Sequence, residues 1–181
     1  MTRKLLLINI IFSQTLIVLI AWILKRLFLP KVTYLELFSL ELNFLSLTTF
    51  LLGSCLLLFL QLLFHKYLPQ ERLFDEINLL LLEKFSLPIL ALIFLGGAIA
   101  EELLFRGIVQ NILGIWLASL LFTLIHFRYL RKIYILLEVY LMGIILGIIY
   151  QLTFSLWIPI LSHFVINFLT ACLIKKGYLE Y

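Results

Sequence analysis

The chain has 181 residues, of which 64% are hydrophobic and only 13% are charged. Soluble proteins average roughly 45–50% apolar and about 25% charged residues, so this composition excludes a soluble globular protein. The net charge of +4 is that expected of basic loops beside anionic lipid head groups, and it does not indicate nucleic-acid binding. Because helices satisfy their own backbone polar groups in lipid, we predict an all-α fold, a polytopic transmembrane helix bundle in the lipid bilayer.

Apolar runs along the chain predict about six helices. Four runs approach the ~20 residues that cross a bilayer, and they cover residues 5–24, 44–64, 133–150 and 154–174. The apolar stretch 87–127 carries glycines and charges, so we predict two helices that meet near residues 111–114, the second of them short. The charged stretch 65–86 predicts a cytoplasmic loop with an interfacial helix. It separates an N-terminal helix pair and loop, residues 1–86, from a C-terminal four-helix unit, residues 87–181.

Basic residues predict how the bundle is oriented. With the N-terminus inside, ten Lys and Arg residues fall in the inner segments and three in the outer ones. Because short cytoplasmic loops collect Lys and Arg, this bias predicts that both termini are cytoplasmic. Residues 5–24 have a basic flank like that of a signal peptide, but the run is too long and no cleavage site follows, so we expect a retained anchor.

The segment EELLFRG, residues 101–107, places two carboxylates and a guanidinium within an apolar helix. A charge at the bilayer centre costs ~3 kcal/mol or more, so such residues are expected to pair, to meet water or to take part in chemistry. Glu102 and Arg106 are four residues apart and share a helix face, which predicts an ion pair. Glu101 points about 100° away from Glu102 and has no local partner.

Two histidines and an asparagine follow in the same C-terminal helices. His126 comes four residues after Phe122, and His163 comes four residues before Asn167, so each pair shares a helix face. Either face can also be explained as polar contacts that hold helices together. Packing contacts alone do not explain the combination of residues. One glutamate without a local partner, two histidines and one asparagine all lie on three helices that can touch.

Two further polar residues, Glu138 and His65, are not assigned to the chemistry. Glu138 lies about two turns inside its helix from Arg131 and Lys132, and we interpret it as their structural partner. His65 lies at a membrane edge beside Lys66, and no role is assigned to it.

The order EELLFRG, FTLIH, HFVIN is similar to the EExxxR, FxxxH and HxxxN motifs of the CPBP (CAAX protease and bacteriocin-processing, Abi) family. This family comprises intramembrane proteases related to type II CAAX prenyl endopeptidases and to bacteriocin-processing and immunity proteins. Its members are commonly labelled metalloproteases, so the resemblance implies a metalloprotease-like endopeptidase. The resemblance covers about residues 88–174. It implies an intramembrane endopeptidase in a bacterial plasma membrane, acting on a membrane-associated peptide or protein.

The resemblance also implies a role for each motif residue. Glu101 would be the general base that takes a proton from water, and His126 would hold the same water. His163 and Asn167 would bind the substrate carbonyl as oxyanion donors. Glu102 with Arg106 would be the structural pair that orients the helix.

A metal remains an open alternative at this stage. Glu101, His126 and His163 are the candidate ligands of a divalent ion such as Zn²⁺, because two histidines and a carboxylate can leave one position open to water. The HExxH signature is absent. The sequence therefore favours a glutamate mechanism without a resident cofactor.

Two further classes of function stay open. Glu101, His126 and His163 could relay protons or bind an ion in a transporter, although no inverted repeat is present. A non-catalytic immunity or scaffold protein could keep the same fold.

Straight helices would leave His126 near the cytoplasmic surface, while Glu101 and His163 lie near mid-membrane. A break at Gly96 and Gly97, a tilt or a water-filled funnel would reconcile these depths. We expect a funnel that opens to the cytoplasm.

Overall fold

In the computed structural model, residues 1–68, 73 and 75–179 are described, and all their regular elements are helices. The all-α prediction is therefore confirmed. The predicted loop 65–86 lies partly outside the described residues, but it contains the short helix α5 (Glu76–Lys84). The helices, in chain order, are α1 (Arg3–Phe28), α2 (Tyr34–Leu37), α3 (Phe44–Tyr67), α5, α6 (Leu87–Glu102), the π-helix η1 (Leu103–Val109), α7 (Gln110–Leu124), the 3₁₀ turn η2 (Phe127–Tyr129), α8 (Ile133–Thr153) and α9 (Trp157–Lys175).

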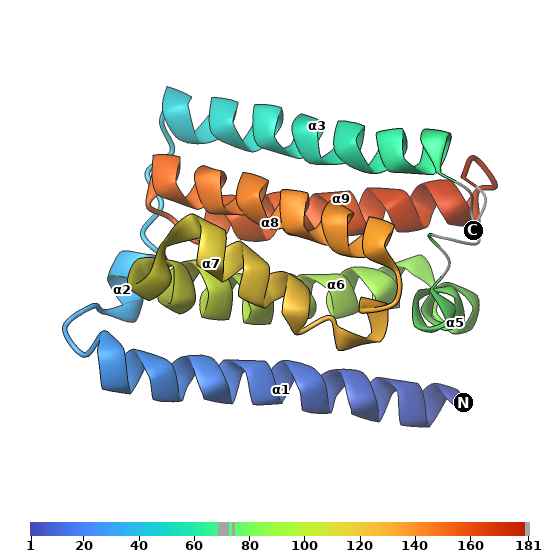
Figure 1. Ribbon diagram of the computed structural model, residues 1–181, viewed down its shortest axis with the longest axis horizontal. Helices are drawn as coiled ribbons and strands as arrows, with labels where there is room; N and C mark the ends of the chain where they lie inside the picture. Colours follow the sequence, from blue (N-terminus) through green and yellow to red (C-terminus); the bar gives the residue numbers. More distant parts are fainter. Residues whose placement is uncertain (69–72, 74, 180–181) are drawn as a thin grey trace.

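Within the described residues, five helices are long and apolar enough to cross a membrane. They are α1, α3, the continuous run of α6, η1 and α7, then α8 and α9. The run breaks at Gly114, whose φ of 79° and ψ of 172° are not helical. The chain reverses there, and α7 runs back beside η1 (Figure 1). The predicted meeting of two helices near residues 111–114 is thus observed, but residues 115–124 are too short to count as a sixth span.

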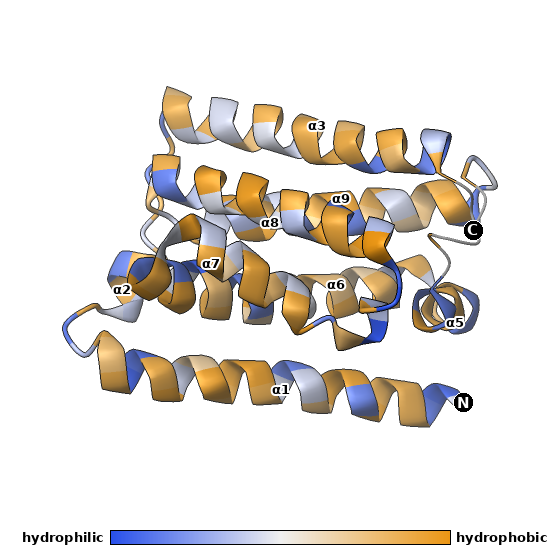
Figure 2. Cartoon of the chain, in the orientation of Figure 1, coloured by the Kyte–Doolittle hydropathy of each residue, from blue (hydrophilic) through white to orange (hydrophobic). Residues whose placement is uncertain are grey.

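The C-terminal helices form the centre of the bundle. Helix α6 packs on α9 and α7 packs on α8, while α1 covers α6 and η1 on one side and α3 covers α8 and α9 on the opposite side (Figure 1). In the most apolar stretch of each helix, only 11% of α1 and 6% of α3 is buried within the protein. The corresponding shares for α8 and α9 are 39% and 44%. Their exposed faces are hydrophobic over most of their length (Figure 2), as expected of helices in contact with lipid.

Gly96 and Gly97 do not break α6, contrary to one of the explanations considered from the sequence. Both residues lie inside the regular helix, where Gln14 of α1 approaches them closely. A Cβ on Gly96 would lie 2.9 Å from the Gln14 Oε1 atom, and Gln14 Nε2 donates a hydrogen bond to the Ile93 carbonyl at 3.0 Å. The glycines therefore allow a polar side chain of α1 to dock on α6.

Candidate active site

The helix that carries the two glutamates changes its winding just after them. Helix α6 ends at Glu102, and the π-helix η1 follows with Arg106 at its centre. π-helical turns are rare and occur often at functional sites. The Arg106 Nε atom lies 3.0 Å from Glu102 Oε2, and both side chains are fully buried. The structure thus confirms the ion pair predicted from the spacing of these residues.

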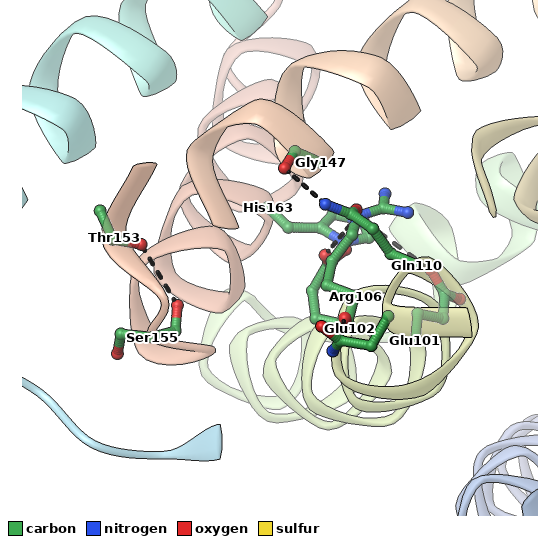
Figure 3. A network of polar contacts seen from close by, with 9 residues as sticks. Glu101, Glu102, Arg106, Gln110, Gly147, Thr153, Ser155 and His163 are labelled. Atoms are coloured by element: carbon green, nitrogen blue, oxygen red, sulfur yellow. Dashed lines mark hydrogen bonds and ion pairs between the residues drawn. The ribbon is translucent and has the colours of Figure 1, made fainter. Parts of the chain in front are cut away.

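Glu102 has a second partner, which the spacing of residues did not predict. Its Oε1 atom lies 2.8 Å from Nδ1 of His163, which is 61 positions away on α9 (Figure 3). A carboxylate only accepts hydrogen bonds, so Nδ1 of His163 carries the proton. The other ring nitrogen, Nε2, lies 3.9 Å from Glu101 Oε2. Arg106, Glu102, His163 and Glu101 therefore form one connected row of polar groups, and Glu102 fixes the orientation of His163.

His126 is held by a similar contact. Helix α7 ends at Leu124, and the His126 Nδ1 atom lies 2.7 Å from the Phe122 carbonyl oxygen. Because a carbonyl accepts, Nδ1 again carries the proton, and Nε2 is left to bind water or substrate. The Phe122 ring lies between the two histidines, 5.0 Å from the His126 ring and 6.2 Å from the His163 ring. Phe122 thus connects the second motif to the third.

A group of polar residues next to His126 was missed by sequence reasoning. The Tyr129 ring stacks on His126 with a centroid distance of 5.9 Å and an angle of 9°. Its hydroxyl donates to the carboxylate of Asp75, 54 positions earlier in the chain, and Arg128 Nη2 lies 2.8 Å from the same carboxylate. Burial is the main effect that raises the pKa of Tyr129, and the Asp75 carboxylate adds to it. Asp75 also caps α5, by accepting from the Ile77 amide, so this group joins α5 to the turn that follows His126.

A cavity of about 370 Å³ connects these elements. All four predicted catalytic residues line it: Glu101, His126, His163 and Asn167. Glu102 and Arg106 are not among the lining residues and lie buried behind Glu101 and His163. The chain reverses at Gly114, 13 residues after Glu101 and 12 residues before His126, so these two residues come to similar levels along the bundle (Figure 1). The cavity wall also contains His65, which had received no role.

The fit of a metal can be judged from the donor set. Both histidines have the Nδ1 contact to an oxygen that metal-bound histidines commonly have. In the described part of the chain, however, no three His, Cys, Asp or Glu side chains come close enough together to hold a metal ion. Glu101, His126 and His163 therefore do not form a metal-ligand set in this arrangement.

Comparisons with known proteins agree with the motifs. The chain is 39% identical over 112 residues to the uncharacterized protein YpbD of Bacillus subtilis (strain 168), and the match covers 61% of this chain and 59% of that protein. No solved structure matches the chain. Residues 83–169 match the family model of the Rce1-like type II CAAX prenyl endopeptidases, and this match includes Glu101, His126, His163 and Asn167. Residues 83–169 of the chain are therefore similar to the Rce1-like type II CAAX prenyl endopeptidases.

Proposed function

We propose that this protein is an intramembrane endopeptidase that hydrolyses a peptide bond of a membrane-associated peptide or protein. The observation that carries the proposal is that Glu101, His126, His163 and Asn167 line one cavity although they come from three separate segments of the chain. The match of residues 83–169 to the Rce1-like family model supports a CAAX protease-type enzyme.

The first step forms the nucleophile. Nε2 of His126 accepts a hydrogen bond from a water molecule, because its Nδ1 proton is already used by the Phe122 carbonyl. Glu101 is the only glutamate of the EELLFRG segment that lines the cavity, and it takes a proton from this water. The water oxygen then attacks the substrate carbonyl carbon, and a tetrahedral intermediate with a negative oxygen forms.

The second step stabilises that oxygen. When His163 carries protons on both nitrogens, Nδ1 donates to Glu102 and Nε2 can donate to the oxyanion. The Glu102 carboxylate at 2.8 Å favours this charged form of the ring. The Asn167 side-chain amide provides a second donor. As the C–N bond breaks, Glu101 returns its proton to the leaving amine, which completes the hydrolysis.

Glu101, two oriented histidines and the Asn167 amide suffice for proton transfer and for oxyanion binding. The proposed mechanism therefore uses no metal and no other cofactor. Helix α1 begins and α9 ends at the same end of the bundle (Figure 1), as the proposed orientation with cytoplasmic termini in a bacterial plasma membrane requires. The cavity reaches α5 at this end, so we place its opening towards the cytoplasm.

The test is cleavage of membrane-anchored peptides by the purified protein in liposomes, with and without a prenyl group on the peptide. The parent protein should cut at least one peptide, and Glu101→Gln should lower the rate ~10²–10⁴-fold, because that is the usual contribution of a general base. Glu83→Gln is the matched control, since Glu83 is an exposed carboxylate of α5. Equal cleavage by the parent and Glu101→Gln proteins would refute the assignment. No cleavage by either would favour a non-catalytic protein of this fold.

A further inference from the structure

Helix α8 carries a buried carboxylate that the proposed mechanism does not use. Glu138 is only 8% exposed, and it lines the same cavity as the proposed catalytic residues. Among the described residues, no hydrogen bond or ion pair involves Glu138, so the predicted pairing with Arg131 or Lys132 is wrong. A lone acidic side chain within a membrane helix is costly to keep, and such residues usually mark a functional site.

The position of Glu138 along the cavity follows from the packing of α8 on α9. These helices are antiparallel (Figure 1) and are joined by a short turn, since α8 ends at Thr153 and α9 begins at Trp157. Gly147 lies six residues before the end of α8, and His163 lies six residues after the start of α9. This register places His163 level with Gly147, which is nine residues beyond Glu138. Glu138 therefore lies roughly 13 Å from His163 along the bundle axis, at ~1.5 Å per residue. The displacement is towards the end that holds α5.

The charges on the cavity wall indicate what Glu138 can bind. Three carboxylates line the cavity, those of Asp75, Glu101 and Glu138, whereas Arg128 is the one Lys or Arg side chain among the described lining residues. Arg128 is already paired with Asp75 at 2.8 Å. Glu101 has His163 as a neighbour at 3.9 Å, whereas Glu138 has no basic partner among the described residues. The cavity wall near Glu138 therefore favours a cation.

We propose that Glu138 binds a Lys or Arg side chain of the peptide substrate, two to four residues from the bond that is cut. An extended peptide advances about 3.3 Å per residue, so 13 Å corresponds to about four residues. A long basic side chain can span part of that distance, which shortens the separation to as few as two residues. The bound cation also neutralises a carboxylate that otherwise has no partner. This inference rests on the proposed endopeptidase function and adds the substrate class to it.

The inference is tested with a mixture of lipid-anchored peptides of randomised sequence, incubated with the full-length protein in liposomes. Mass spectrometry of the products gives the frequency of each residue at each position around the cut. Lys and Arg should be enriched about tenfold or more at one position two to four residues from the cut, on the side that faces α5. Glu138→Gln should abolish this enrichment, and Glu138→Lys should replace it with enrichment of Asp and Glu. Glu83→Gln, which removes an exposed carboxylate outside the cavity, should leave it unchanged.

Should Glu138→Lys fail to fold, Glu138→Asp takes its place and should retain the preference that Glu138→Gln loses. Cleavage by the parent protein without enrichment of Lys and Arg would overturn the inference, as would an enrichment that survives in Glu138→Gln. The same mixture incubated with Glu101→Gln separates the two proposals. If the parent cuts and Glu101→Gln does not, the endopeptidase stands even where the Glu138 preference is absent. If neither protein cuts any peptide, both proposals are wrong.

Discussion

Replacing Arg106 with Met should destabilise the protein strongly. The Arg106 Nε atom lies 3.0 Å from Glu102 Oε2, and both side chains are fully buried. At that distance the pair attracts with ~5 kcal/mol at an effective dielectric constant of 20. Its net contribution is smaller because both charges lose their hydration, but removal of Arg106 leaves the buried Glu102 carboxylate with His163 Nδ1 as its remaining partner. Loss of a partner in this setting costs roughly 3–5 kcal/mol. The contact of the guanidinium with the Phe122 ring, at 5.0 Å, is lost as well.

A double substitution makes this prediction specific. Glu102→Gln removes the negative charge but keeps an oxygen that can accept from His163 Nδ1. In the double variant, therefore, no buried carboxylate is left without its arginine. The double variant should be less destabilised than the sum of the two single variants, by about 1–3 kcal/mol. The measurement is the free energy of unfolding in mixed micelles during titration with a denaturing detergent.

Arg26 provides the matched control, because it is an exposed arginine of α1. Arg26→Met should change the free energy of unfolding by no more than ~0.5 kcal/mol. If Arg106→Met unfolded at the same detergent fraction as the parent protein, the buried ion pair would contribute nothing. The role of Glu102 as an anchor for His163 would then need another explanation.

Three further predictions concern the surroundings of the cavity. Asp75→Asn should lower the cleavage rate with little change in overall stability, because it weakens the contact that holds Tyr129 against His126; an unchanged rate would contradict this. Because burial raises the pKa of Tyr129, its neutral form stabilises the fold fully below a pH of about 10 and loses this effect as pH rises further. The stability difference from Tyr129→Phe should therefore fall above pH ~10, while a constant difference would count against the burial of this hydroxyl. Exhaustive chelation should inhibit cleavage only weakly, with less than one equivalent of zinc by elemental analysis; a stoichiometric ion lost in both His126→Ala and His163→Ala would make these histidines ligands.

Local spacing was sufficient for features formed within one helix. The i, i+4 relation gave the Glu102–Arg106 pair, and the apolar runs gave the positions of α1, α3, α8 and α9. The meeting of two helices near residues 111–114 was also predicted, from the glycines and charges of the stretch 87–127. In the structure, Gly114 adopts a positive φ there, which other residues rarely adopt. The number of spans was less certain, since a ten-residue arm such as 115–124 cannot be distinguished by composition from a full crossing.

Contacts between distant segments could not be obtained from spacing. The bond from Glu102 to His163 and the bond from Tyr129 to Asp75 each join residues more than 50 positions apart, and helix periodicity contains no information about such pairs. Asp75 offered a local signal as the N-cap of α5, but not its partner. Glu138 was assigned to the nearest basic residues in sequence, whereas the packing of α8 turns it towards the cavity.

The central claim is that a water molecule activated by Glu101 and His126 cuts a peptide bond in this cavity. The most direct measurement is single-turnover cleavage of a membrane-anchored peptide in ¹⁸O-labelled water, followed by mass spectrometry of both products. The account predicts one ¹⁸O atom in the new carboxyl group of the N-terminal product, and a ~10²–10⁴-fold slower reaction for Glu101→Gln. Cleavage at the parent rate by Glu101→Gln, or a product without the label, would contradict it.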